Sequence, residues 1–482
     1  MTTIFRPWLA GIACAAALAP GAADADSTPE LAALRAEIAQ LKEDYSNRVS
    51  QLEQRIEQLE AAAPAAPAAN AEIAGAAAAP GAAATPETTA PSPAVGSGGG
   101  SGTAFNPAMS VILTGNYANL SQDPGTYRIA GFQPGGDEIG PGERGFSLGE
   151  SELTLSASVD PYFFANLTAA FSSDGGVDVE EAFFRSTALP GGFTLKGGRF
   201  FSGIGYLNEV HAHAWDFADQ PLVYQAFFGG QLHQDGLQLK WLAPTDLFLE
   251  LGAEAGNGDS FPATRKNSND LNTVALFAHV GGDAGESISW RAGLSWLDAD
   301  AVDRTYDDTD AFGAPVTNSF TGQSRTWIAD TTLKWAPGGD SRQKALLLHA
   351  EYMRREDSGR LAYDVAGSAL DGPYHTRQDG WYAQAVYRFA PRWRAGLRYD
   401  ALDSGNTRIG LVDDGTLSRD DFPLLAPATP SRITLMADWS PSEFTRIRAQ
   451  YAWDDARDSG STDEQWLLQY IYAIGAHGAH KF

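Results

Sequence analysis

The chain has 482 residues, of which 43% are hydrophobic and 20% charged, and its 34 Lys and Arg residues face 60 Asp and Glu residues for a formal net charge of -26. This composition is ordinary for a folded protein, but the negative charge argues against a nucleic-acid-binding protein. After the N-terminus there is no apolar run of about 18 residues, which excludes a helical membrane span but not a β-barrel, whose strands are short and half apolar.

Residues 1–25 have the features of a secretory signal peptide. Arg6 provides the positive end, residues 7–18 are largely apolar, and residues 23–25 form an A-x-A cleavage sequence. The one cysteine, Cys14, lies in this signal, so the mature chain is predicted to contain no disulfide and no cysteine metal site. The alternative, in which Cys14 is the acylated residue of a lipoprotein, stays open.

Residues 26–60 are predicted to form a periplasmic coiled coil. Apolar residues recur at alternating spacings of three and four, as heptads require, with one stutter between Tyr45 and Val49. The apolar positions are Leu31, Leu34, Ile38, Leu41, Tyr45, Val49, Leu52, Ile56 and Leu59. Because so narrow a stripe stabilises a single helix poorly, we expect self-association; a monomeric helix lying on another surface is the alternative.

Residues 61–104 are rich in Ala, Pro, Gly, Ser and Thr, and they show neither periodicity nor appreciable charge. This composition is typical of a linker without regular structure.

From residue 105 to residue 482 the pattern changes to a period of two. In residues 432–439, for example, Ile433, Leu435, Ala437 and Trp439 alternate with mostly polar residues. Such alternation indicates β-strands with one apolar and one polar face. An all-β fold is therefore predicted for this part of the chain.

The connections between these strands alternate between tight turns and longer polar segments. The longer ones are predicted at 120–145, 202–235, 256–271, 298–324, 354–378 and 402–430. Outer-membrane barrels have short periplasmic turns and long external loops, so we predict a transmembrane antiparallel up-and-down β-barrel of about 16 strands.

The C-terminal residue supports a barrel independently. Phe482 is separated by an even number of residues from each member of an apolar row, so on one continuous strand it would lie on the same face. The row consists of Trp466, Leu468, Tyr470, Tyr472 and Ile474. A terminal aromatic residue on an amphipathic strand resembles the signal read by the outer-membrane barrel-assembly machinery, and Phe482 is assigned that role.

Several segments resemble a family of Gram-negative outer-membrane porin-like proteins, whose members are often labelled porins or zinc-regulated TonB-dependent receptors. They include residues 144–152 (RGFSLGESE), 198–221 (GRFFSGIGYLNEVHAHAWDFADQP), 241–254 (WLAPTDLFLELGAE) and 475–482 (GAHGAHKF). The receptor label fits poorly, because such receptors resemble 22-stranded barrels with a globular plug. Here the region before the barrel is predicted to be coiled coil and linker.

The third long connection, 202–235, contains acidic residues and histidines but no Lys or Arg. In general porins the third loop enters the lumen and narrows the pore, and by that analogy this connection is expected to form the constriction. The candidate constriction residues are Glu209, His211, His213, Asp216, Asp219 and Asp235.

Basic residues at polar strand positions are candidates for the facing pore wall. They are Lys196, Arg291, Lys334, Arg388, Arg394, Arg398, Arg432, Arg446 and Arg448. An acidic loop opposite a basic wall would create a transverse field that orients dipolar solutes. The alternative is that these cations pair with acids such as Asp400 and Asp438 and keep a wet lumen neutral.

Two metal sites are considered, although no resident cofactor is expected. His211, His213 and Asp216 could bind zinc through imidazole and carboxylate groups, although loop histidines more often form local hydrogen bonds. Calcium could bind the aspartates of expected external loops, for which a solvated acidic surface is the alternative. These aspartates are Asp298, Asp300, Asp303, Asp307, Asp308, Asp310, Asp454, Asp455 and Asp458.

The sequence contains no nucleophile elbow, phosphate-binding loop or HExxH motif, so we expect no enzyme activity. The expected function is passive diffusion of small hydrophilic solutes or ions across the outer membrane of a Gram-negative bacterium. The alternatives are a zinc-linked uptake protein and an envelope tether. Expected partners are membrane lipid, lipopolysaccharide, the barrel-assembly machinery, peptidoglycan and two further copies of the chain in a homotrimer, but no nucleic acid.

Overall fold

The computed structural model describes residues 107–136, 139–173, 175–265 and 267–475. In these ranges, no helix is both long and apolar enough to span a membrane. The expected signal peptide, coiled coil, linker and terminal Phe482 lie outside the described residues.

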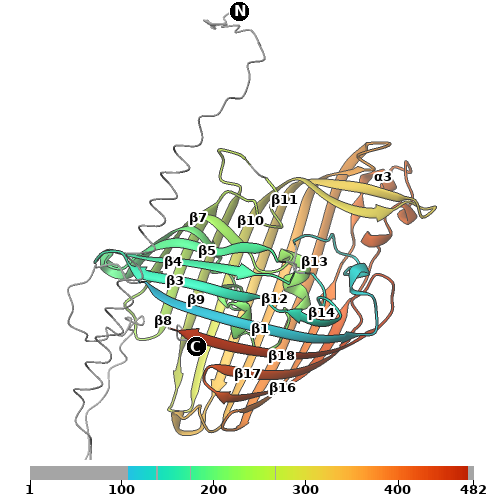
Figure 1. Ribbon diagram of the computed structural model, residues 1–482. Helices are drawn as coiled ribbons and strands as arrows, with labels where there is room; N and C mark the ends of the chain where they lie inside the picture. The colour runs from blue at the N-terminus through green and yellow to red at the C-terminus, as the bar shows by residue number, and fades with distance from the viewer. Residues whose placement is uncertain (1–106, 137–138, 174, 266, 476–482) are drawn as a thin grey trace, which may run out of the picture. The chain divides into compact units, whose positions relative to one another are not determined.

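The described chain forms a closed antiparallel β-barrel of 16 strands, which confirms the predicted fold class (Figure 1). Each strand pairs with its neighbours in sequence, and the first and last strands close the barrel, with Ser110 opposite Gly475 and Leu120 opposite Gln465. The strands are β1 (Ala108–Leu120), β2 (Gly145–Leu148), β3 (Ser151–Ser158), β4 (Phe163–Phe171), β5 (Val177–Ser186), β6 (Phe193–Phe201), β7 (His233–Leu242), β8 (Phe248–Gly256), β9 (Thr273–Ala284), β10 (Ile288–Thr309), β11 (Pro315–Trp335), β12 (Ala345–Tyr363), β13 (Leu370–Ala390), β14 (Trp393–Asp403), β15 (Arg408–Ile409), β16 (Ser431–Ser442), β17 (Thr445–Asp454) and β18 (Asp463–Gly475).

Two of the 18 strands in the described chain, β2 and β15, are short and do not form wall strands of their own. β2 and β3 both pair with β1, so they are two parts of one interrupted wall strand. β15 has two residues and pairs with β13 beyond the end of β14, whose other neighbour in the wall is β16.

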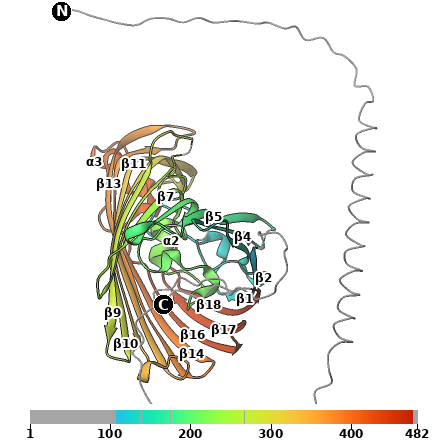
Figure 2. The ribbon, with the colours of Figure 1, turned by 90° about the vertical axis from the view of Figure 1, so that its left-hand side faces the viewer.

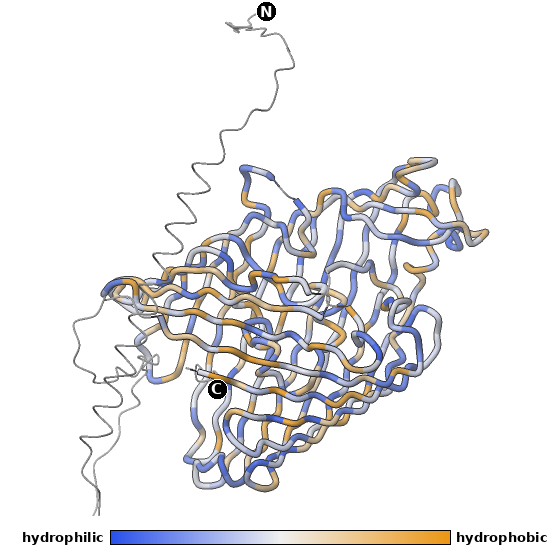
Figure 3. Tube along the Cα trace, viewed as in Figure 1, coloured by the Kyte–Doolittle hydropathy of each residue, from blue (hydrophilic) through white to orange (hydrophobic). Residues whose placement is uncertain are grey.

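The two faces of the wall differ as the period of two predicts. On β16, buried Arg432, Thr434 and Asp438 alternate with exposed Ile433 and Leu435. The exposed large side chains of the other strands are also mainly Leu, Trp, Tyr and Phe. Figure 3 shows the same alternation along neighbouring strands. An apolar outer face around a polar interior is the reverse of a soluble barrel and is typical of a barrel that faces lipid.

Four long connections lie where they were expected, at 121–144, 202–232, 257–272 and 404–430. The predicted loops 298–324 and 354–378 are wrong, because β10 and β11 continue to residues 309 and 315, and β12 and β13 continue to residues 363 and 370. Five of the aspartates expected in a loop, Asp298, Asp300, Asp303, Asp307 and Asp308, therefore lie on β10, and Asp454 ends β17.

Polar sequence was mistaken for loop in these two regions. Arg325 donates to Asp298 across β10 and β11 at 3.0 Å, and Arg360 donates to Asp371 across β12 and β13 at 2.5 Å. Opposite charges on neighbouring strands stabilise a sheet, so pairing continues where the outer face is charged. The extended strands carry a separate apolar cluster, which also contains Leu411 of α3 (Gly410–Asp413) and Leu424 and Leu425 of η7 (Pro423–Leu425). Phe422, which follows η6 (Arg419–Asp421), belongs to it as well.

The 202–232 connection lies inside the barrel (Figure 2). It contains η3 (Leu207–Glu209), η4 (Ala212–Ala214) and α2 (Leu222–Phe228). α2 follows Pro221 and ends at Gly229, whose φ of 64° gives the left-handed turn that commonly closes a helix. All of its side chains are buried. The remaining one-turn helices are η1 (Pro124–Thr126), η2 (Pro190–Gly192) and η5 (Pro337–Gly339).

Candidate functional site in the barrel lumen

An apolar cluster joins α2 to the inner face of the barrel. Val223, Tyr224 and Phe227 of the helix are no more than 1% exposed. They belong to the same cluster as inward-facing side chains of β9 to β14, which are Ala275, Leu297, Ala299, Ile328, Met353, Tyr382 and Leu402. A lumen filled by packed apolar side chains differs from the water-filled interior of an open pore.

Glu351 of β12 anchors the first half of the connection. Its buried carboxylate accepts the backbone N–H groups of Tyr206 at 3.2 Å and Leu207 at 3.1 Å, and the hydroxyl of Tyr224 at 3.1 Å. The Tyr382 hydroxyl donates to it at 2.7 Å from the neighbouring strand. One wall carboxylate therefore holds both the entry to η3 and the middle of α2.

Arginines of β14, β16 and β17 anchor the second part of the connection. Arg398 and Arg432 contact Asp219 at 3.0 and 2.8 Å, and Arg394 contacts Asp216 at 2.7 Å. The backbone carbonyl of Trp215 accepts hydrogen bonds from two more wall arginines, which are Arg446 and Arg448.

The acids of the connection and the basic wall are thus in direct contact. Wall acids share the same cations, because Arg398 also donates to Asp400 at 2.9 Å and Arg394 to Asp438 at 2.5 Å. Direct pairs compensate these charges in place. They leave Asp216 and Asp219 fixed against the wall.

The other candidate residues lie in varied surroundings. Glu209 pairs with Lys240 of β7 at 3.1 Å. Arg291 and Lys196 lie over aromatic rings, Arg291 over Tyr206 and Lys196 over Phe183 and Phe200. Lys334 and Arg388 are half-buried on β11 and β13.

Asp235 was expected in the constriction, but it lies on β7 and pairs across the sheet with Arg199 of β6 at 2.6 Å. Its assignment to the connection was wrong because β7 begins at His233, two residues before it. Asp235 is therefore a wall residue.

The anchors Glu351 and Arg355 of β12 were missed. Arg355 is 1% exposed and donates to the backbone carbonyls of Ala226 and Phe227 at 3.2 Å each. The sequence did contain a sign of these anchors, because Glu351, Arg355 and Asp357 are separated by even numbers of residues and so share one face of a strand. It was overlooked because this region had been assigned partly to a loop.

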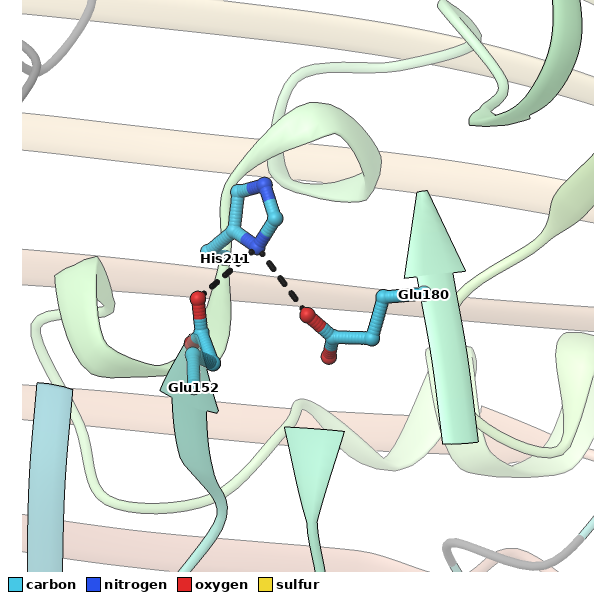
Figure 4. Close-up of side chains that lie close together, drawn as sticks. All are labelled: Glu152, Glu180 and His211. Atoms are coloured by element: carbon cyan, nitrogen blue, oxygen red, sulfur yellow. Dashed lines mark ion pairs between the residues drawn. The ribbon is translucent and has the colours of Figure 1, made fainter. Parts of the chain in front are cut away.

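Three glutamates surround His211, as Figure 4 shows for two of them. Its Nδ1 lies 3.3 Å from Glu152 Oε2 and 3.3 Å from Glu180 Oε2, and its Nε2 lies 3.2 Å from Glu181 Oε2. Burial would lower the pKa of the His211 imidazole, but contacts with the three carboxylates raise it well above its ordinary value. The site therefore concentrates negative charge around one imidazole.

The wall supplies Glu180 and Glu181 through a β-bulge. Thr168 of β4 lies opposite Glu181 and Ala169 lies opposite Val179, so Glu180 is an extra residue without a partner. Both glutamates are buried on the lumen side, although successive strand residues normally face opposite ways. Bulges occur beside functional sites, where they redirect a side chain.

The ligand set expected for zinc needs correction. His211 lies in the cluster, but Asp216 accepts hydrogen bonds from Arg394 at 2.7 Å and from Gln384 at 3.2 Å. His213 lies one step away, with its Nδ1 2.6 Å from Glu152 Oε1. The three residues predicted together are thus not brought together, and the carboxylates beside His211 come from the wall.

The ion pairs of Asp219 with the wall arginines should make the stability of the protein depend on pH. Burial would raise the pKa of Asp219, but Arg398, Arg432 and Gln450 hold it below its ordinary value. We expect Asp219→Asn to lower the unfolding temperature in detergent, as followed by circular dichroism. The difference in unfolding temperature between the variant and wild type should be largest above the pKa of an aspartate in the unfolded chain, about 3.9. It should disappear as the pH falls through the lower pKa of Asp219 in the folded protein. A difference lost between neutral pH and about pH 5 would contradict this assignment.

No family model matches the chain. An uncharacterized protein of Aquifex aeolicus (strain VF5) is 32% identical over 403 residues, which span 79% of this chain and 80% of that protein.

Solved structures similar to this barrel include a loop L8 deletion mutant of OmpT, an outer membrane protein of Vibrio cholerae. It has a TM-score of 0.47 and 13% identity, covering 77% of this chain and 99% of that one. An anion-selective porin of Comamonas acidovorans gives a TM-score of 0.47 and 10% identity over 77% and 99% of the two chains. The outer membrane channel DcaP of Acinetobacter baumannii gives 0.45 and 14% over 77% and 97%.

The similarity to the Aquifex aeolicus protein extends over most of both chains. The chain belongs to the same family as that protein.

Proposed function

We propose that this protein is an outer-membrane channel of the porin type, in which the 202–232 connection controls the passage of small hydrophilic solutes or ions. The observation that carries the proposal is a segment crossing a lumen whose wall is lined by charged side chains. The segment is held on one side by Glu351 and on the other by Arg394, Arg398 and Arg432. No catalytic step is assigned.

The outer surface supports a membrane location. Exposed apolar side chains on successive strands suit contact with lipid, and charged cross-strand pairs on β10 to β13 suit water beyond it. We place the short-turn end in the periplasm and the long connections outside, next to lipopolysaccharide. Assembly by the barrel-assembly machinery, a homotrimer and a periplasmic stalk that reaches peptidoglycan belong to the same proposal.

The test is single-channel recording of the purified full-length protein in planar bilayers. Stepwise conductance, in groups of three steps for a trimer, is the expected result, and the reversal potential in a salt gradient gives the ion preference. Absence of conductance at every voltage, also after the 202–232 connection has been shortened, would overturn the channel proposal.

Deletion of residues 26–102 separates this function from that of an envelope tether. A channel should conduct without those residues, whereas a tether should lose its effect on envelope integrity. Normal conductance together with an unchanged envelope would exclude the tether.

A second candidate function is zinc-linked uptake, the alternative to simple diffusion. The arrangement of His211 with Glu152 and Glu180 favours it, because imidazole and carboxylate groups are common zinc ligands. Zinc-dependent conductance that disappears in His211→Ala would support this alternative, and conductance unaffected by zinc would exclude it.

A further inference from the structure

We propose that Glu152, Glu180 and His211 bind one divalent transition-metal ion of the zinc class between the 202–232 connection and the barrel wall. The site draws one ligand from β3, one from β5 and one from the connection (Figure 4). This inference does not depend on conduction, since a metal could bind whether or not the lumen opens.

The distances fit such an ion. His211 Nδ1 lies 3.3 Å from each of the two carboxylate oxygens, and the three atoms lie within 4.8 Å of one another. Metal bonds of about 2.0–2.2 Å in a tetrahedral arrangement separate neighbouring ligand atoms by roughly 3.3–3.6 Å. Two of the three separations therefore already match the spacing that zinc requires, and the two carboxylate oxygens lie within 4.8 Å of each other.

Hydrogen bonding at the centre of the cluster is incomplete. Glu180 Oε2 and His211 Nδ1 are both buried, Glu180 being only 8% exposed, and they face each other at 3.3 Å as an ion pair that lacks the geometry of a directed hydrogen bond. A single Nδ1–H group could donate to only one of the two carboxylates that lie at equal distance from it. Buried polar groups normally make directed hydrogen bonds, so two carboxylates that share one ring nitrogen favour a bound cation between them.

Surrounding groups hold the ligands in place. Glu181 Oε2 lies 3.2 Å from His211 Nε2, and His213 Nδ1 lies 2.6 Å from the second oxygen of Glu152. A metal-bound histidine typically donates its other ring N–H to a carboxylate, which fixes its tautomer and orientation. Glu181 is positioned for that role, and the metal would take the place of the proton on Nδ1.

Charge also favours a cation. Three carboxylates meet two imidazoles here, with that of His233 also close enough to act on Glu180 and Glu181, and the three glutamates are each at most 9% exposed. Lys196 lies close enough to act on Glu181 electrostatically, so it offsets part of the charge. A divalent ion would offset more of the remaining negative charge, and three protein ligands leave a fourth tetrahedral position for water.

The test is metal binding by the full-length protein in detergent, with Zn²⁺ titrated against a chromophoric chelator at neutral pH. We expect one high-affinity ion per chain. His211→Ala and Glu180→Gln should abolish that binding, and Glu181→Gln should weaken it by about 10–100-fold. His375→Ala is the matched control, because His375 is exposed on β13, and it should bind as wild type does.

Binding that survives in both His211→Ala and Glu180→Gln would overturn the proposal. Heat-modifiable migration in gels shows whether each variant is folded. If the variants fail to assemble, X-ray absorption of the zinc-loaded wild type decides. One imidazole with oxygen ligands supports the site, and no imidazole or several imidazoles overturn it.

Discussion

Replacing residues 204–231 with a short Gly-Ser turn is expected to raise single-channel conductance several-fold. These residues fill the lumen, and without them a barrel of 16 strands should contain a water-filled channel. The barrel itself should survive, because Phe201 and His233 are already paired on neighbouring strands and the Ser202 N–H donates to the Leu232 carbonyl at 3.0 Å.

Planar-bilayer recordings of the shortened and wild-type proteins under identical salt provide the measurement. A matched control is Phe312→Ser at the tip of the β10–β11 hairpin, where the side chain is 96% exposed and far from the lumen contacts described above. Its conductance should equal that of wild type. Equal conductance of the shortened protein and wild type would mean that the connection does not restrict passage.

Glu351→Ala is expected to release the connection from the wall without removing it. The substitution deletes the acceptor of the Tyr206 and Leu207 N–H groups and of the Tyr224 hydroxyl. Hydrogen bonds to a charged group contribute about 1.5–3 kcal/mol each, so their combined loss should free both η3 and α2. We expect frequent transitions to higher conductance and cleavage by chymotrypsin at the aromatic residues of the connection.

Asp330→Asn is the matched control for this change. Asp330 is a buried inward-facing acid on β11, next to β12, but both of its oxygens lack hydrogen-bond partners. The control should leave chymotrypsin resistance and conductance nearly unchanged. Combining Glu351→Ala with the shortened connection gives a second check, because the substitution should then add nothing to the conductance. An additive increase would show that Glu351 acts elsewhere.

Most of the barrel could be predicted because the membrane imposes a strong pattern. Residues that face lipid must be apolar and many inward residues are polar, so a strand such as 431–442 can be recognised by alternation. The pattern failed for the ends of β10 to β13, where charged residues occupy both faces. Those segments are strands because cross-strand pairs such as Arg360 with Asp371 replace the apolar signal.

The candidate site was only partly predictable for a related reason. His211 was predicted as a metal ligand because His213 and Asp216 lie near it in sequence. Its contacts in the structure come from Glu152 and Glu180, which lie 59 and 31 residues earlier. Spacing along the chain cannot reveal a partner that folding supplies. Asp216 was chosen as a ligand because it is near His211 in sequence, yet the arginine of a distant strand holds it.

The bulge in β5 makes the cluster sensitive to chain length as well as to side-chain identity. Glu180 is the one residue of the strand that has no partner on β4, and deleting it would restore an uninterrupted ladder with Glu181 still facing inward. Gain or loss of this third carboxylate therefore requires only one codon to be inserted or removed. Among homologous barrels, an alignment gap at this position would separate chains that have the full cluster from chains that lack it.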